Sequence, residues 1–146
     1  MQDESGDTSP RRGFMTSSRH TEHLAAGGGH LLADQQSTRG RLTLIESRVG
    51  PGDTTPAHVH AEMDEAFYVL EGSYTVRCGE DTFTAEAGSF VYLPHGLPHS
   101  YEAGAQGGRK LIFGLPAGLE DFFRDMETME DWQGLGRRHG ITFLRD

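Results

Sequence analysis

The feature that most constrains the fold is a pair of histidines separated by one residue, His58 and His60, within the segment 52–72. Side chains two residues apart point the same way on a β-strand, whereas on a helix they diverge by more than half a turn. The aromatic and aliphatic run at 66–70 also favours a strand. We therefore expect His58, His60 and Glu65 to converge from one strand, a short turn and the start of the next strand.

A further histidine, His99, follows a turn rich in proline and glycine at 94–98. Imidazole nitrogens and carboxylate oxygens are ligands of first-row transition metals. The sequence therefore predicts a metal site made by His58, His60, Glu65 and His99.

Other side chains near these four are weaker candidates. Glu62 comes too early for the carboxylate ligand, and Asp64 breaks the spacing to the next glycine. His95 is expected at the rim of the site, because it lies in the turn. The histidines outside this region are expected to be surface or capping residues, and they are His20, His23, His30 and His139.

These residues carry a family resemblance. The segment 52–72 fills every fixed position of Gly-x5-His-x-His-x4-Glu-x6-Gly, and 88–103 fits Gly-x5-Pro-x-Gly-x2-His-x3-Asn except that Ala103 replaces the asparagine. Both patterns resemble the motifs of the cupin superfamily. The resemblance implies an all-β fold, a single jelly-roll cupin barrel, with the same four residues as metal ligands. The asparagine is not a ligand in that family, so its replacement leaves the expected metal site intact.

The chain divides into three expected parts. Residues 1–19 are polar and predict a disordered tail. Residues 20–115 predict the barrel, because short strands alternate with turns. We expect strands at 30–34, 41–49, 66–70, 74–78, 82–85, 90–93, 99–102 and 109–114, a turn at 37–40, and a hairpin in which 74–78 pairs back after Gly72.

Residues 116–146 predict a helical segment that packs on the outside or at one end of the barrel. Apolar residues recur at helical spacing in 118–126, and a second short helix is expected at 131–138. The start of this segment is similar to the tail of small quercetinase-like cupins.

Charge and composition exclude some partners. A net charge of −9 without a basic cluster disfavours nucleic acids. The apolar runs are too short to span a membrane, and an apolar signal core is missing, so we expect a cytoplasmic protein. The chain has a single lysine, which disfavours a highly anionic substrate unless an arginine enters the barrel; the candidates on strands are Arg41, Arg48, Arg77 and Arg109.

The expected ligand set suits several divalent ions. We expect Fe(II), with Mn, Ni, Co, Cu or Zn as alternatives. A bound cation stabilises an enolate or phenolate, and Glu65 is the candidate catalytic base. Phe67, Val69 and Tyr101 share strand parity with the ligands, so they either line a pocket or belong to the core.

Three functions remain open at this point. The resemblance to quercetinase-like cupins implies a dioxygenase that uses O₂ to oxidise an enolisable or phenolic small molecule, such as a flavonol or a polyketide-like enol. The second is a metal-dependent isomerase, cyclase or decarboxylase of a biosynthetic pathway, and the third is a non-catalytic small-molecule binder. The family also implies a homodimer, with the strand near His30 as a candidate for pairing between subunits.

Overall fold

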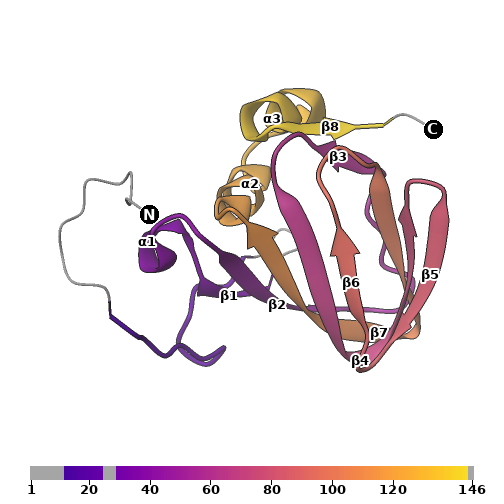
Figure 1. The fold of residues 1–146 in the computed structure, drawn as a ribbon, viewed down its shortest axis with the longest axis horizontal. Coiled ribbons are helices and arrows are strands. Elements are labelled where there is room, and N and C mark those ends of the chain that lie inside the picture. The colour runs from indigo at the N-terminus through magenta and orange to yellow at the C-terminus, as the bar shows by residue number, and fades with distance from the viewer. Residues whose placement is uncertain (1–11, 25–28, 145–146) are drawn as a thin grey trace.

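The computed structural model describes residues 12–24 and 29–144. The first part of the chain forms β1 (His30–Ala33), the short helix α1 (Gln35–Thr38), β2 (Thr43–Val49) and β3 (His58–His60). The centre consists of β4 (Asp64–Cys78), β5 (Asp81–Glu86), β6 (Phe90–Leu93) and β7 (His99–Leu115). The C-terminal part forms α2 (Leu119–Met126), α3 (Trp132–His139) and β8 (Ile141–Phe143). The predicted all-β barrel with a helical C-terminal segment is confirmed (Figure 1).

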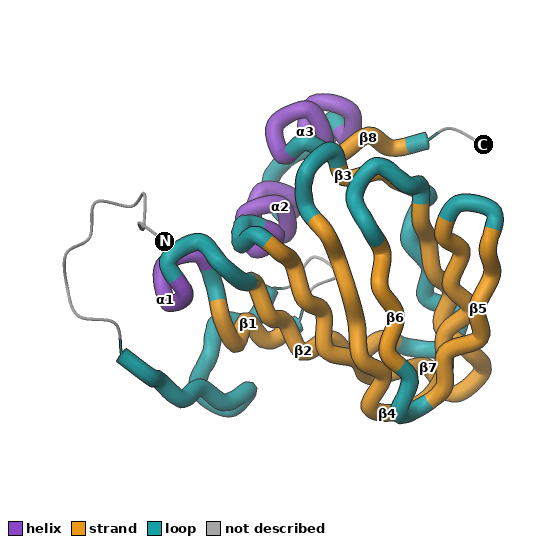
Figure 2. The backbone as a smooth tube through the Cα atoms, in the orientation of Figure 1, coloured by secondary structure: helices purple, strands orange, loops and turns teal. Residues whose placement is uncertain are grey.

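The sheet is a single hydrogen-bonded surface folded over on itself. Its strands run in the order β1-β2-β7-β3-β8, while β4 pairs with β5, β6 and β7. The two longest strands, β4 and β7, are antiparallel partners along almost their whole length, and both bend from one layer to the other (Figure 2). This shared bend closes the barrel and brings β3 beside the start of β7.

The predicted hairpin at Gly72 is wrong. Residues Tyr74 to Cys78 continue β4 rather than pairing back on it, and they pair with β5 on one side and with the start of β7 on the other. The register between β4 and β7 shifts on both sides of Gly72, where φ is +72°. The glycine therefore bends the strand between layers and does not reverse it.

The turn expected at 37–40 is wrong in its first half, because residues 37 and 38 end the short helix α1 and only Arg39 and Gly40 form a turn. Asp34 caps α1, since its carboxylate accepts a hydrogen bond from the Ser37 amide at 2.7 Å. Arg39 then adopts the left-handed conformation, with φ of 56°. Within the expected N-terminal tail, residues 1–11 lie outside the described residues, and 12–19 form neither helix nor strand.

The C-terminal segment packs at one end of the barrel. Both predicted helices are present, and Gly140 ends α3 in the left-handed conformation. The buried carboxylate of Glu120 in α2 accepts hydrogen bonds from Thr43 Oγ1 and the amide of Gln35, which ties α2 to the barrel. After α3, β8 pairs with β3 in a register that places Ile141 opposite His60. This added strand was not predicted.

Two apolar clusters stabilise the molecule. One lies between β4, β5, β6 and β7, and its larger members are Phe67, Val69, Tyr74, Val76, Val91 and Leu93. The other lies between β1, β2, β7 and the C-terminal segment, and it includes Leu31, Ile45, Ile112, Leu119, Phe122 and Leu135. Within the described residues, no helix is long and apolar enough to span a membrane.

Candidate metal centre

The four predicted metal ligands come together from three strands. His58 and His60 lie on β3, Glu65 is the second residue of β4, and His99 is the first residue of β7. His58 and His99 are direct cross-strand partners. One ligand atom from each of the four side chains lies within 4.8 Å of all the others. Atoms bound about 2.0–2.2 Å from a shared ion lie roughly 3.0–4.4 Å apart, so the cluster needs only small movements to hold one ion.

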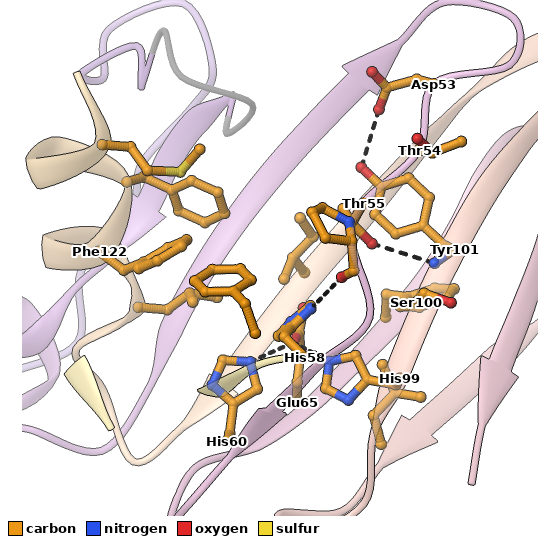
Figure 3. A pocket seen from close by; sticks show the side chains of 18 of the residues that line it. Asp53, Thr54, Thr55, His58, His60, Glu65, His99, Ser100, Tyr101 and Phe122 are labelled. Carbon is orange, nitrogen blue, oxygen red and sulfur yellow. Dashed lines mark hydrogen bonds and ion pairs between the residues drawn. The ribbon is translucent and has the colours of Figure 1, made fainter. Parts of the chain in front are cut away.

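Hydrogen bonds orient the ring of His58. Its Nδ1 lies 2.9 Å from the carbonyl oxygen of Pro56, which accepts a hydrogen bond from Nδ1–H and leaves the lone pair of Nε2 free to bind a metal. Glu65 is the centre of the cluster, because its Oε2 lies 3.1 Å from His99 Nε2 and 3.2 Å from His60 Nε2 (Figure 3).

Two buried nitrogens in the cluster have no hydrogen-bond partner, and they are His60 Nε2 and His99 Nδ1. His60 is 3% exposed, and its Nε2, although close to Glu65, makes no hydrogen bond with acceptable geometry. A buried polar atom without a partner costs free energy. A metal ion among these four side chains would give His60 Nε2 a partner, so the residues present fit the metal that the sequence predicts.

The protonation states also favour metal binding. Burial raises the pKa of Glu65, but its contacts with His60 and His99 outweigh this effect and hold the pKa well below its ordinary value. Burial and the neighbouring His99 lower the pKa of His58 to about 4. At neutral pH the cluster therefore presents a carboxylate and a neutral imidazole, which are the forms that bind metals.

The rival carboxylates and the rim histidine lie apart from this cluster. Tyr92 donates a hydrogen bond to Asp64 at 2.6 Å, and His95 Nδ1 lies 2.7 Å from the same carboxylate. Tyr92 and His95 together lower the pKa of Asp64 to about 2. Glu62 is exposed. Asp64 and His95 therefore pair with each other, as expected for residues outside the metal site.

The cluster forms part of the wall of a cavity of about 170 Å³. Of the three residues for which pocket and core were both left open, Phe67 and Tyr101 line this cavity, whereas Val69 belongs to the core cluster and does not line it. In Figure 3 the four ligands gather at one end of the cavity, with Asp53 and Tyr101 toward the other.

Sequence reasoning missed much of the cavity wall. The C-terminal segment contributes six apolar side chains, which are Leu119, Phe122, Phe123, Met126, Trp132 and Phe143. The helical spacing of 118–126 indicated an apolar face but not that this face meets the metal site. Lys110 also lines the cavity. The one signal in the sequence that could have placed it inside the barrel is that it shares strand parity with the apolar Ile112.

The loop before β3 is held without the asparagine of the second motif. The backbone of Ala103 holds this loop, because its carbonyl oxygen accepts a hydrogen bond from the Gly52 amide at 3.1 Å and its amide donates to the Asp53 carbonyl oxygen at 2.8 Å. A further hydrogen bond joins the Thr55 amide to the Tyr101 carbonyl at 3.2 Å. These contacts fix the segment that leads into His58.

Comparison with known proteins supports the same family. Residues 45–111 match the cupin domain family. The chain is 30% identical over 71 residues to quercetin 2,3-dioxygenase of Bacillus subtilis, and this region covers 49% of the chain but only 21% of that relative.

Solved structures share the fold. An RmlC-like cupin from Shewanella frigidimarina superposes with a TM-score of 0.63 at 21% identity, covering 76% of this chain and 96% of its own. The polyketide cyclase RemF from Streptomyces resistomycificus gives a TM-score of 0.60 at 25% identity, covering 71% of this chain and 80% of its own. The barrel, both sequence motifs and these similarities together support a protein of the cupin superfamily.

Proposed function

We propose that this protein is a metal-dependent dioxygenase that oxidises an enolisable or phenolic small molecule with O₂. The observation that carries the proposal is the convergence of His58, His60, Glu65 and His99 on the wall of a largely apolar cavity. Similarity to a quercetin 2,3-dioxygenase supports the same choice. Fe(II) is the proposed metal, with Mn, Ni, Co, Cu or Zn as alternatives for three imidazoles and one carboxylate.

A divalent cation held by these four residues would supply the charge that stabilises an enolate or phenolate, and a redox-active one would assist electron transfer to O₂. Glu65 acts as the base that accepts the hydroxyl proton of the substrate, since its side chain lines the cavity beside the three histidines. The substrate provides the electrons that reduce O₂, and both oxygen atoms enter the product, so the reaction needs no external reductant.

The apolar side chains exclude water and limit the size of the substrate. Ligand pockets for drug-sized molecules measure about 300–1,000 Å³, whereas a cavity of about 150 Å³ accepts benzene. The cavity of about 170 Å³ therefore suits a substrate with one ring. A flavonol would require displacement of the residues that α2 contributes, among them Phe122 and Phe123.

Oxygen uptake by the Fe(II)-loaded protein with catechols, single-ring enols and flavonols tests this proposal. We expect Glu65→Gln to lower the rate by at least about 100-fold, because a positioned base contributes roughly 10²–10⁴-fold. Glu62→Gln is the matched control, since Glu62 is an exposed carboxylate outside the cluster. Metal content is measured in each variant. Full uptake by metal-loaded Glu65→Gln protein would remove Glu65 as the base.

A second candidate is a metal-dependent cyclase, isomerase or decarboxylase, which the similarity to a polyketide cyclase favours. Such a reaction consumes no O₂. Substrate conversion under strict anaerobiosis would support this candidate over the dioxygenase, whereas binding without any product would leave a small-molecule binder.

We also propose that the protein acts in the cytoplasm as a homodimer. Tyr68 and Phe90 are cross-strand partners on β4 and β6, and together with Tyr92 they expose apolar surface, with 38%, 63% and 49% of each residue accessible. Burial of this surface would favour association. Light scattering should give twice the 16.0 kDa of one chain, and a mass of one chain would refute the dimer. Cell fractionation tests the compartment.

A further inference from the structure

The single lysine of the chain, Lys110, points into the barrel. It lies on β7 with the same parity as Ile112, is 1% exposed, and lines the same cavity as the metal ligands. Its Nζ lies 3.4 Å from the ring centroid of Tyr101, 4.1 Å from that of Tyr74 and 5.2 Å from that of Phe67. Three aromatic rings therefore surround the amine.

The amine has no hydrogen-bond partner among the described residues. Aromatic faces attract the positive charge of an ammonium but leave its N–H groups without acceptors. Burial lowers the pKa of Lys110 to about 7, while the negative charges of Glu65 and Asp53 oppose this shift. A buried ammonium without a hydrogen-bond acceptor destabilises the fold. Proteins retain such destabilising groups where function needs them, and here a bound ligand would supply the missing acceptor.

Among the described residues, Lys110 is the only lysine or arginine that lines the cavity. Arg41, Arg48 and Arg77 are exposed, and Arg109 binds Glu46 and Glu71 at 3.0 and 3.3 Å on the outside of the sheet. None of these four arginines, which were the candidates for contacting an anionic substrate, enters the barrel. Lys110 takes that place instead.

We propose that Lys110 forms an anion-binding subsite in this cavity, where its Nζ donates hydrogen bonds to a carboxylate or another anionic oxygen of the substrate. This inference rests on the proposed function only in placing a small-molecule substrate in the cavity. A molecule held by Lys110 on one side and facing His58, His60, Glu65 and His99 on the other carries two oxygen functions. The substrate class is therefore a single-ring or similarly small acid with an enol or phenol group.

The binding of benzoate and benzamide to the Zn²⁺-loaded protein tests this subsite by calorimetry. The two molecules have nearly the same shape, but only benzoate is charged. We expect benzoate to bind about 10- to 100-fold more tightly, because a hydrogen bond to a charged group contributes at this level. Lys110→Met should abolish the preference while keeping the length of the side chain. Arg77→Met, which removes an exposed charge, should retain it.

Because the chain has one lysine, protein labelled with [¹³Cε]lysine gives a single lysine resonance. We expect benzoate, and not benzamide, to shift this resonance. Failure of benzoate to bind, or an equal preference in wild-type protein and Lys110→Met, would overturn the proposal, since benzoate would then bind elsewhere or only at the metal. The test uses no O₂ and no turnover, so a protein that fails as a dioxygenase can still confirm the subsite.

Thermal unfolding verifies that Lys110→Met is folded. The pKa of Lys110 is lower in the folded protein than in the unfolded chain, so between about pH 7 and 10.5 the unfolded chain binds the extra proton. Wild-type stability should therefore rise across this window, and the cost of the buried ammonium is fully present below it. Lys110→Met should be more stable than wild type at pH 6, with a melting temperature higher by about 3–9 °C.

Discussion

Replacement of His60 by alanine is expected to lower the affinity for a divalent transition metal by at least about 100-fold. Changes to groups that merely orient metal ligands already reduce affinity by about 10- to 100-fold, and removal of a ligand costs more. His60 is buried against Glu65 with its Nε2 unpaired, and among the described residues only the other three ligands share its cluster. Competition with a chromophoric chelator, combined with metal analysis of the purified protein, measures the change.

His95→Ala is the matched control for this experiment. His95 is also a histidine near the cluster, but its side chain is 55% exposed and pairs with Asp64. We expect its replacement to leave the metal affinity within a factor of about three, as for a surface substitution. If His60→Ala binds metal as tightly as His95→Ala does, the cluster is not the metal site.

The metal cluster could be predicted because its determinants are local. Strand parity aligns His58 with His60, and the fixed spacing to Glu65 leaves room for one turn between β3 and β4. His99 follows from the second motif, since the turn at 94–98 brings β7 back beside β3. Each of these relations depends on a short stretch of sequence, and the structure confirms that the four side chains converge.

The features that escaped prediction depend on contacts between distant parts of the chain. Nothing near Ile141 shows that β8 will pair with β3, because the pairing depends on how α2 and α3 fold over the barrel. Lys110 was missed because a charged side chain in a strand normally faces solvent. Val69 shares parity with Phe67 and belongs to the same core cluster, but only Phe67 reaches the cavity wall.

The second large effect is expected at Gly72. We expect Gly72→Ala to lower the free energy of unfolding by more than about 4 kcal/mol. The residue has φ of +72°, which costs an L-residue about 1–2 kcal/mol. It also faces the opposite bend of β7 directly. A Cβ atom would collide with the carbonyl oxygen of Gly107 and lie 2.9 Å from Gly108 Cα. These are backbone atoms of the paired strand, so they cannot move without breaking the bend.

Gly52→Ala separates the two causes. Gly52 has nearly the same conformation, with φ of +73°, but a Cβ atom there meets nothing within 4 Å. We expect this variant to lose only the conformational cost of about 1–2 kcal/mol. Urea unfolding of both variants measures the difference between their free energies of unfolding. Failure of Gly72→Ala to fold would also agree with a larger loss at Gly72. Equal losses would mean that the close approach of β4 and β7 is unimportant, and that Gly72 is required only for its backbone angle. A larger loss at Gly72 would show that this motif glycine lets two bent strands touch, which is the contact that closes the barrel around the metal cluster.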